Sequence, residues 1–122
     1  MLSFWFFFIL FSLVITIPLS SAASKLRLDE FKRHRAQLVG SKFSLFCTIQ
    51  EGNGPLRFEW TKDGRILSLT GVNHQVKSTS EDNSVFTINQ LSTADAGNYS
   101  CLVKNAAGQS DQQTTMLTLK GF

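Results

Sequence analysis

Two cysteines, two histidines and nine carboxylates are the residues in this chain of 122 that have the potential for chemistry. A zinc site needs closely spaced pairs of ligands, and Cys47, Cys101, His34 and His74 supply no such pair. Catalysis would be indicated by a nucleophile elbow, a His-Glu-x-x-His pair or a glycine-rich phosphate loop, and none occurs. We therefore expect no enzyme, no metal and no cofactor.

A second pattern surrounds the cysteines and resembles that of an immunoglobulin-type sandwich. Its members are Cys47, Trp60, Leu91, Asp95, Gly97, Tyr99 and Cys101, the last five at spacings of four, two, two and two. The resemblance implies that Cys47 and Cys101 join facing sheets, that Trp60 packs on the bridge and that the Tyr99 hydroxyl bonds the corner backbone. A bridge of this kind contributes about 4 kcal/mol and requires an oxidising compartment. Two buried free thiols are the alternative.

Asp95 and the two histidines are expected to have structural or surface roles. We expect Asp95 to accept hydrogen bonds, or a salt bridge from a base such as Lys77, at the corner that precedes Tyr99. We expect His34 and His74 to be solvated surface residues.

Apolar residues alternate with period two where a sandwich needs its strands. The inward rows are Phe43, Leu45, Cys47 and Ile49; Leu56, Phe58 and Trp60; Phe86, Ile88 and Leu91; Tyr99, Cys101 and Val103; and Leu117 and Leu119. Turns are predicted at 52–55, 63–64 and 105–108. A weaker strand is predicted at 72–77, and 26–39 should hold a split first strand.

Three motifs make the resemblance more specific, over about residues 38–119. They are Trp60-Thr61-Lys62-Asp63-Gly64, the stretch from Leu91 to Cys101, and the turn Asn105-Ala106-Ala107-Gly108. Together they resemble the I-set branch of the immunoglobulin superfamily, and residues 56–67 look most like extracellular domains of the Down syndrome cell adhesion molecule and hemicentin families. The implied fold is all-β: a two-sheet antiparallel Greek-key sandwich with one inter-sheet disulfide.

The first 23 residues have the layout of a secretory signal peptide. Residues 4–17 are uncharged and almost wholly apolar, and Ser21 and Ala23 precede a plausible cleavage point, although no base precedes the apolar stretch. A signal anchor is the alternative, but fourteen helical residues span only about 21 Å, against about 30 Å of hydrocarbon. We expect a leader at 1–23, a basic segment with the first strand at 24–37, and an I-set domain at 38–120 that is secreted, or displayed at the cell surface within a longer receptor.

The net charge of +3 arises in one short segment. Its bases are Lys25, Arg27, Lys32, Arg33 and Arg35, set against Asp29 and Glu30, while the rest of the chain balances. Such a strip suits an anionic glycan or a membrane surface. A solvated strand is the simpler alternative. Nucleic acid is not expected, because no aromatic stripe accompanies the bases.

Asn98-Tyr99-Ser100 is a sequon for N-linked glycosylation. With Tyr99 and Cys101 pointing inward, Asn98 faces solvent, so a glycan would not disturb the core. The alternative is that Asn98 simply occupies a corner position.

Function is expected to reside on an exposed sheet face. We predict that Leu102 and Met116 stand together there among Arg57, Glu59, Thr61 and Lys104, as an apolar spot with a polar rim. Two ordinary exposed residues are the alternative. The expected role is non-enzymatic extracellular recognition of a protein, including a second copy of the chain. The resemblance implies cell adhesion or axon guidance; a soluble immune-recognition or decoy protein and a matrix module are the alternatives.

Overall fold

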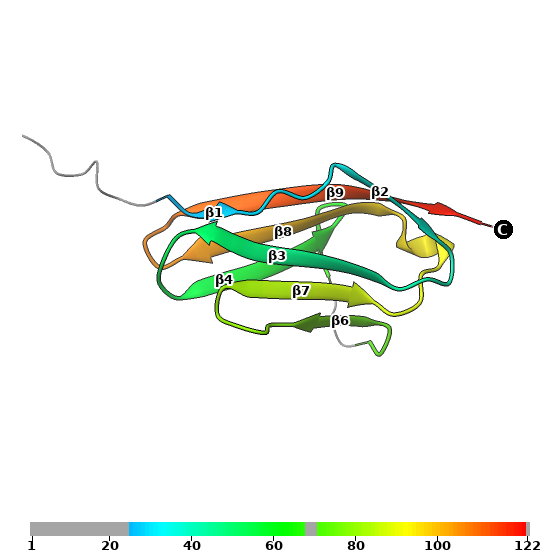
Figure 1. Ribbon diagram of the computed structural model, residues 1–122, viewed down its shortest axis with the longest axis horizontal. Coiled ribbons are helices and arrows are strands. Elements are labelled where there is room, and N and C mark those ends of the chain that lie inside the picture. Colours follow the sequence, from blue (N-terminus) through cyan, green and yellow to red (C-terminus); the bar gives the residue numbers. More distant parts are fainter. Residues whose placement is uncertain (1–24, 68–70, 122) are drawn as a thin grey trace, which may run out of the picture.

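The computed structural model describes residues 25–67 and 71–121. In these residues, nine strands form two packed sheets, and one short helix lies between two of the strands (Figure 1). The first sheet has the order β1-β3-β7-β6 and the second the order β2-β9-β8-β4-β5. The elements are β1 (Arg27–Leu28), β2 (His34–Leu38), β3 (Phe43–Glu51), β4 (Leu56–Lys62), β5 (Arg65–Ile66), β6 (His74–Lys77), β7 (Asn83–Ile88), the 3₁₀ helix η2 (Thr93–Asp95), β8 (Gly97–Asn105) and β9 (Ser110–Lys120). The predicted leader lies outside the described residues.

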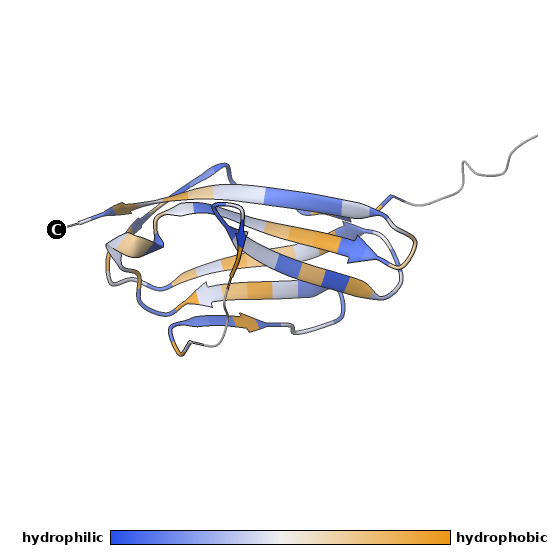
Figure 2. Ribbon diagram, turned by 180° about the vertical axis from the view of Figure 1, so that it is seen from behind, coloured by the Kyte–Doolittle hydropathy of each residue, from blue (hydrophilic) through white to orange (hydrophobic). Residues whose placement is uncertain are grey.

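Alternating side chains build the core, because successive residues of a strand point to opposite faces. Hydrophobic and hydrophilic bands accordingly follow one another along the strands (Figure 2). The buried apolar residues include Phe43, Leu45, Phe86, Ile88, Leu91, Tyr99, Val103 and Leu117. The predicted all-β sandwich is confirmed.

The predicted disulfide joins the two layers. Cys47 of β3 and Cys101 of β8 are bridged with their Cα atoms 6.4 Å apart, and both are fully buried. Trp60 lies directly opposite Cys101 in the sheet register, and its indole N–H donates a 2.9 Å hydrogen bond to the buried hydroxyl of Ser84 on the other layer. The Trp60 ring also packs at 5.6 Å from that of Phe86. Covalent and polar links therefore cross the same apolar core.

The first strand is split, as expected, between the two sheets. β1 pairs with β3, whereas β2 runs parallel to β9, an exception in an otherwise antiparallel sandwich. This split separates the bases that the sequence groups together. Arg27 forms a 2.7 Å ion pair with Glu51 on the first sheet, while the guanidinium of Arg35, on the second, lies 4.9 Å from the ring centroid of Phe43. Arg27 and Arg35 therefore lie on different sheets.

The corner before β8 is held by Tyr99 and Asp95. The buried Tyr99 hydroxyl donates to the backbone carbonyl of Asp95, and the Asp95 carboxylate accepts the backbone N–H of Ser92 at 2.8 Å. Burial, followed by the charges of Asp95 and Asp63, raises the pKa of Tyr99 above its ordinary value, so its hydroxyl stays protonated as the donor this bond requires.

Asp95 accepts hydrogen bonds at this corner, as expected, but the base beside it is His74 and not Lys77. Its carboxylate contacts the ring Nε2 of His74 at 3.0 Å, and Lys77 is exposed. His74 is therefore not a solvated residue: its ring stacks 6.2 Å from that of Phe86. The strand also begins later than predicted, at His74, and Val72 is 87% exposed. Alternation explains the partner, because His74 and Val76 face the interior and Lys77 points away from it.

Candidate binding face

The outward side chains of the second sheet change in character along the strands, from charged through hydroxyl-bearing to apolar. Register places three rows on it: Arg57 beside Lys104, Glu59 beside Leu102 and Gln112, and Thr61 beside Ser100 and Thr114. A further row holds Asn98, Met116 and His34. The face therefore has a charged end with an apolar residue, a band of hydroxyl groups, and a second apolar position at the other end.

Leu102 and Met116 do not stand together, contrary to the sequence-based prediction. The hairpin turn pairs Lys104 with Ser110, so Leu102 lies opposite Gln112 and Met116 lies opposite Asn98. Four residues of β8 separate the two positions, which corresponds to about 13 Å. The alternation of the strands was predicted correctly, but the turn length, which fixes the register, was not taken into account.

Ile66 takes the place that was expected for Met116. The Asp63-Gly64 turn, with φ of 50° and 81°, folds β5 back on β4 so that Ile66 pairs with Thr61. Ile66 is 73% exposed, and it lines one hollow of about 380 Å³ together with Leu102. Ile66 was not among the residues predicted for this face, although the two-residue Asp-Gly turn is a strong signal for a hairpin that would place it there.

Charges of both signs surround this apolar pair. Arg57, Glu59 and Lys104 line the same hollow, and all three are exposed. Their backbones pair within the β4–β8 ladder, but none of the three side chains makes a hydrogen bond or an ion pair within the described part of the chain, so their charged groups are available to a partner. We call Arg57, Glu59, Ile66, Leu102 and Lys104 the binding hollow.

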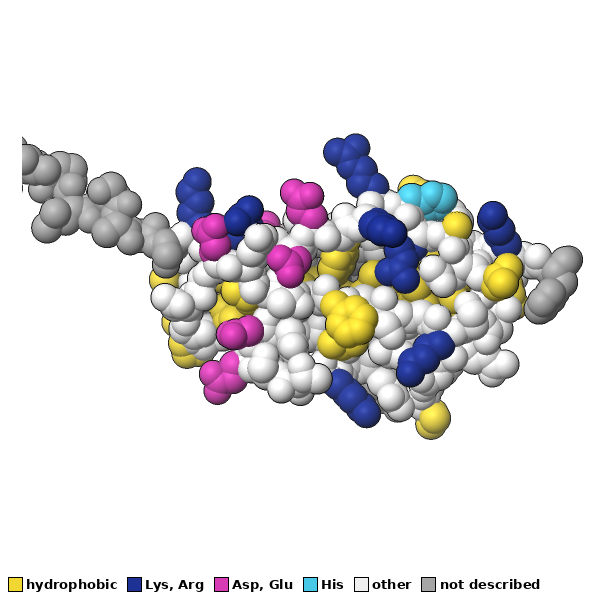
Figure 3. Space-filling view, viewed as in Figure 1, with side chains coloured by type: hydrophobic (Ala, Val, Ile, Leu, Met, Phe, Trp, Pro, Cys, Tyr) yellow, Lys and Arg dark blue, Asp and Glu magenta, His cyan; other side chains and the backbone are white. Residues whose placement is uncertain are grey.

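The opposite sheet offers a different surface. Phe46 is 64% exposed on β3, opposite Val85 of β7. The neighbouring outward side chains on these strands are Ser44, Thr48 and Thr87, none of them charged. Figure 3 shows this face, with acidic side chains gathered toward the end that holds the β3–β4 loop and most of the basic ones toward the other. On the next strand, β6, the exposed Lys77 lies beside Val85 in the same row. The Phe46 row therefore offers a base without a carboxylate, whereas the binding hollow has charges of both signs.

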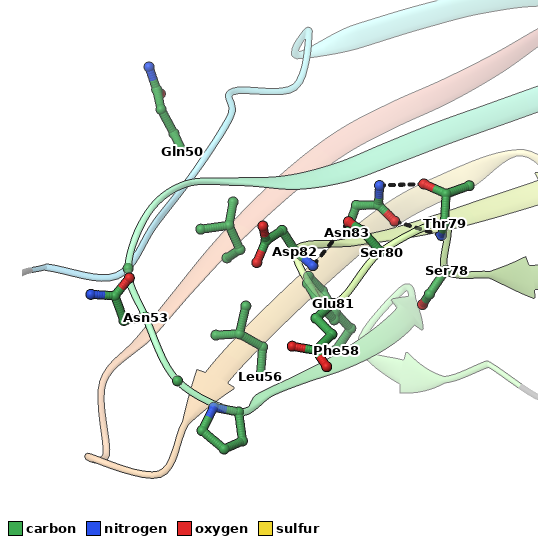
Figure 4. A pocket seen from close by; sticks show the side chains of 14 residues that line it. Gln50, Asn53, Leu56, Phe58, Ser78, Thr79, Ser80, Glu81, Asp82 and Asn83 are labelled. Atoms are coloured by element: carbon green, nitrogen blue, oxygen red, sulfur yellow. Dashed lines mark hydrogen bonds between the residues drawn. The ribbon is translucent and has the colours of Figure 1, made fainter.

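A larger hollow of about 1070 Å³ opens at one end of the sandwich, between residues 52–55 and 78–82 (Figure 4). Leu56 and Phe58 line it on one side. On the other, the Asn83 side chain bonds the Thr79 hydroxyl at 2.7 Å and the Thr79 N–H at 3.0 Å. These hydrogen bonds fix the conformation of the β6–β7 loop, which forms one wall of the hollow.

Within the described ranges, 25–67 and 71–121, no three His, Cys, Asp or Glu residues gather as metal ligands would. His34, one of the candidates considered for such a site, is exposed and bonds Thr118 at 2.7 Å. In that same part of the chain, no helix has the length and apolar character needed to cross a bilayer.

A family model described as an immunoglobulin domain matches residues 30–105. The chain is 30% identical over 90 residues to vascular endothelial growth factor receptor 3 of Coturnix coturnix, and 33% identical over 94 residues to cell adhesion molecule Dscam2 of Drosophila melanogaster. These alignments include 70% and 76% of this chain but only 6% and 4% of the two relatives, so the chain spans a small fraction of their length.

Solved structures show the same architecture. The Dscam1 Ig7 domain, isoform 5, matches with a TM-score of 0.71 at 20% identity, covering 81% of this chain and 100% of that one. The N-terminal Ig1-2 module of the Drosophila receptor protein tyrosine phosphatase DLAR matches with a TM-score of 0.70 at 21% identity, covering 80% of this chain and 50% of that one. At these identities the likeness concerns the fold.

Proposed function

The chain belongs to the immunoglobulin domain family, and from this premise we propose that it is a non-enzymatic extracellular recognition module that binds a second copy of itself through the binding hollow. Its curated relatives include a growth factor receptor and cell adhesion molecules. An extracellular location also suits the Cys47–Cys101 bridge, which persists in an oxidising compartment.

The observation that supports the hollow is the apolar pair of Ile66 and Leu102 among unpaired charges of both signs. Small central apolar groups with a polar rim carry most of the energy of modest interfaces. Arg57 and Lys104 beside Glu59 make the rim suitable for self-complementary contact, because a twofold axis would bring the bases of one copy toward the carboxylate of the other.

The test is sedimentation equilibrium of the purified chain up to about 1 mM, the weak end of specific affinity. We expect a dimer for the parent and a monomer for the variant that combines Ile66→Asp and Leu102→Asp. Removing a central contact costs about 2 kcal/mol or more. In a twofold dimer each change acts twice, so one change alone costs about 4 kcal/mol and dimerisation should weaken at least about 1000-fold. Met116→Asp is the matched control, because it places the same charge on the same face outside the hollow.

Circular dichroism and thermal melting must show that all three proteins are folded. A parent that stays monomeric throughout this range would refute self-recognition. A double variant that dimerises like the parent would show that the interface lies elsewhere, and equal weakening by Met116→Asp would extend it along the whole face.

A further inference from the structure

Asn98 is a well-presented acceptor for an N-linked glycan. Its backbone is fixed by two hydrogen bonds with Asp63, from the Asn98 N–H to the Asp63 carboxylate at 2.9 Å and from the Asp63 N–H to the Asn98 carbonyl at 2.8 Å. The Asn98 side chain is exposed, and its amide makes no hydrogen bond within the described part of the chain. The adjacent Tyr99 is fully buried, so alternation directs Asn98 outward.

Ser100, the other residue of the acceptor signal, is buried in the folded domain. Ser100 supplies the hydroxyl that the Asn-x-Ser signal requires, but in the folded domain it is only 8% exposed. Its Oγ lies 2.7 Å from the hydroxyl oxygen of Thr114 on β9. Once β8 and β9 pair, an enzyme that must recognise this hydroxyl can no longer reach it.

We propose that Asn98 carries an N-linked glycan that is attached before β8 pairs with β9, and that this glycan covers the Met116 end of the second sheet. The donor is a polyprenyl pyrophosphate-linked oligosaccharide. The amide nitrogen of Asn98 attacks the anomeric carbon and loses a proton, an N–C bond forms, the C–O bond to the pyrophosphate breaks, and the lipid pyrophosphate leaves. The proposal rests on the extracellular location given above.

The register determines what the glycan covers. Met116 lies directly opposite Asn98, about 5 Å away across the sheet, and His34 follows on the next strand. Leu102 of the binding hollow lies about 13 Å along β8. Ile66 of the hollow lies in the row of Thr61 and Ser100, but two strands away from β8, on β5. The glycan therefore shields one half of the face and leaves the hollow open to a partner.

The first experiment measures glycan attachment. The full chain, with its own first 23 residues, is expressed in a eukaryotic secretory cell line, and its mass is determined before and after enzymatic removal of N-glycans. The parent should lose the mass of one oligosaccharide and retain Asp in place of Asn98. Asn98→Gln should show no loss of mass, and Ser100→Thr, which keeps the hydroxyl, should behave as the parent. An unchanged parent mass would overturn the proposal, whatever the outcome of the dimer assay.

The second experiment tests the order of events. Bacterially produced chain is offered to microsomal oligosaccharyl transferase with its lipid-linked donor, either folded or reduced and alkylated at Cys47 and Cys101. The unfolded chain should accept the glycan and the folded chain should not. Equal modification of the two would refute the claim that pairing of β8 with β9 closes the site.

The third experiment measures coverage. Met116 is the single methionine after Met1, and it is 48% exposed, so peroxide should convert it to the sulfoxide readily when it is uncovered. Its oxidation, followed by peptide mass, should be several-fold slower in the glycosylated chain than in the enzymatically deglycosylated chain, with a free methionine peptide as internal standard. Equal rates would show that the glycan points away from this end of the sheet.

Discussion

Replacing Asp95 by Ala should reveal how strongly the corner before β8 supports the domain. The carboxylate is 6% exposed and accepts the backbone N–H of Ser92 at 2.8 Å and its hydroxyl at 3.2 Å. Its other oxygen contacts Nε2 of His74 at 3.0 Å. Asp95→Ala removes both functions, the cap of η2 and the link to β6.

The expected cost follows from these contacts. Loss of a helix cap destabilises by about 1 kcal/mol, and a hydrogen bond to a charged group contributes about 1.5–3 kcal/mol. We therefore expect Asp95→Ala to lower the free energy of unfolding by about 3 kcal/mol. His74→Phe keeps the ring against Phe86 and loses only the contact with the carboxylate, so a double-mutant cycle of the two changes should give a coupling of about 2 kcal/mol.

The effect should depend on pH in a defined direction. Burial alone would raise the pKa of Asp95, but the hydrogen bond from the Ser92 backbone and the contact with His74 outweigh it and hold that pKa below the ordinary 3.8. A lowered folded-state pKa gives stability that is present above the unfolded value and is lost as the pH falls through the folded value. The difference in the free energy of unfolding between the parent and Asp95→Ala should therefore be largest at pH 7 and should decrease below about pH 4.

Urea unfolding followed by tryptophan fluorescence measures these differences, because Trp60 is buried in the core. Glu81→Ala is the matched control, since this carboxylate is exposed and makes no hydrogen bond or ion pair within the described residues. A destabilisation by Asp95→Ala below about 1 kcal/mol would refute the structural role assigned here. A difference in the free energy of unfolding that increases in acid would refute the lowered pKa of Asp95.

Two further changes test the covalent and backbone constraints. Gly97→Ala should destabilise by about 1–3 kcal/mol, because φ is +154° and an added Cβ would lie 2.7 Å from the Asp63 carboxylate; Gly108→Ala, with φ of +83° and open space, should cost less in the same urea titration. Reduction of the Cys47–Cys101 bridge, which spans 54 residues, should cost about 4 kcal/mol, and a melting temperature unaffected by reductant would contradict this estimate.

The sequence predicted correctly which side chains of a strand point into the core, but it did not predict which outward side chains of neighbouring strands lie next to each other. Period two identifies which side of a strand is buried, and Phe43, Cys47 and Tyr99 lie inside accordingly. Neighbours across strands depend on register, which turn length sets. Counting outward from the 105–109 turn would have paired Met116 with Asn98 and separated it from Leu102.

The contact between His74 and Asp95 was not predicted, for a different reason. His74 meets Asp95 because the short strand β6 lies beside β7 and directs the histidine inward, next to Phe86. A strand was predicted at 72–77, but with one charged and two polar side chains among the four residues of β6, no apolar period showed which of them faces inward. Ile66 was missed similarly, since β5 has only two residues, although the turn before it was recognised.

The parallel pairing of β2 with β9 delays completion of the second sheet during synthesis. His34 of β2 meets Met116 of β9, 82 residues later in the chain, and contacts so distant in sequence make β-sandwiches fold in milliseconds to seconds. Ribosomes add about 5–20 residues per second, so the interval between Asn98 and Met116 takes about 1–4 s to synthesise. Throughout that interval β8 has no complete partner in β9, and Ser100 remains accessible on a chain whose sheet cannot yet close.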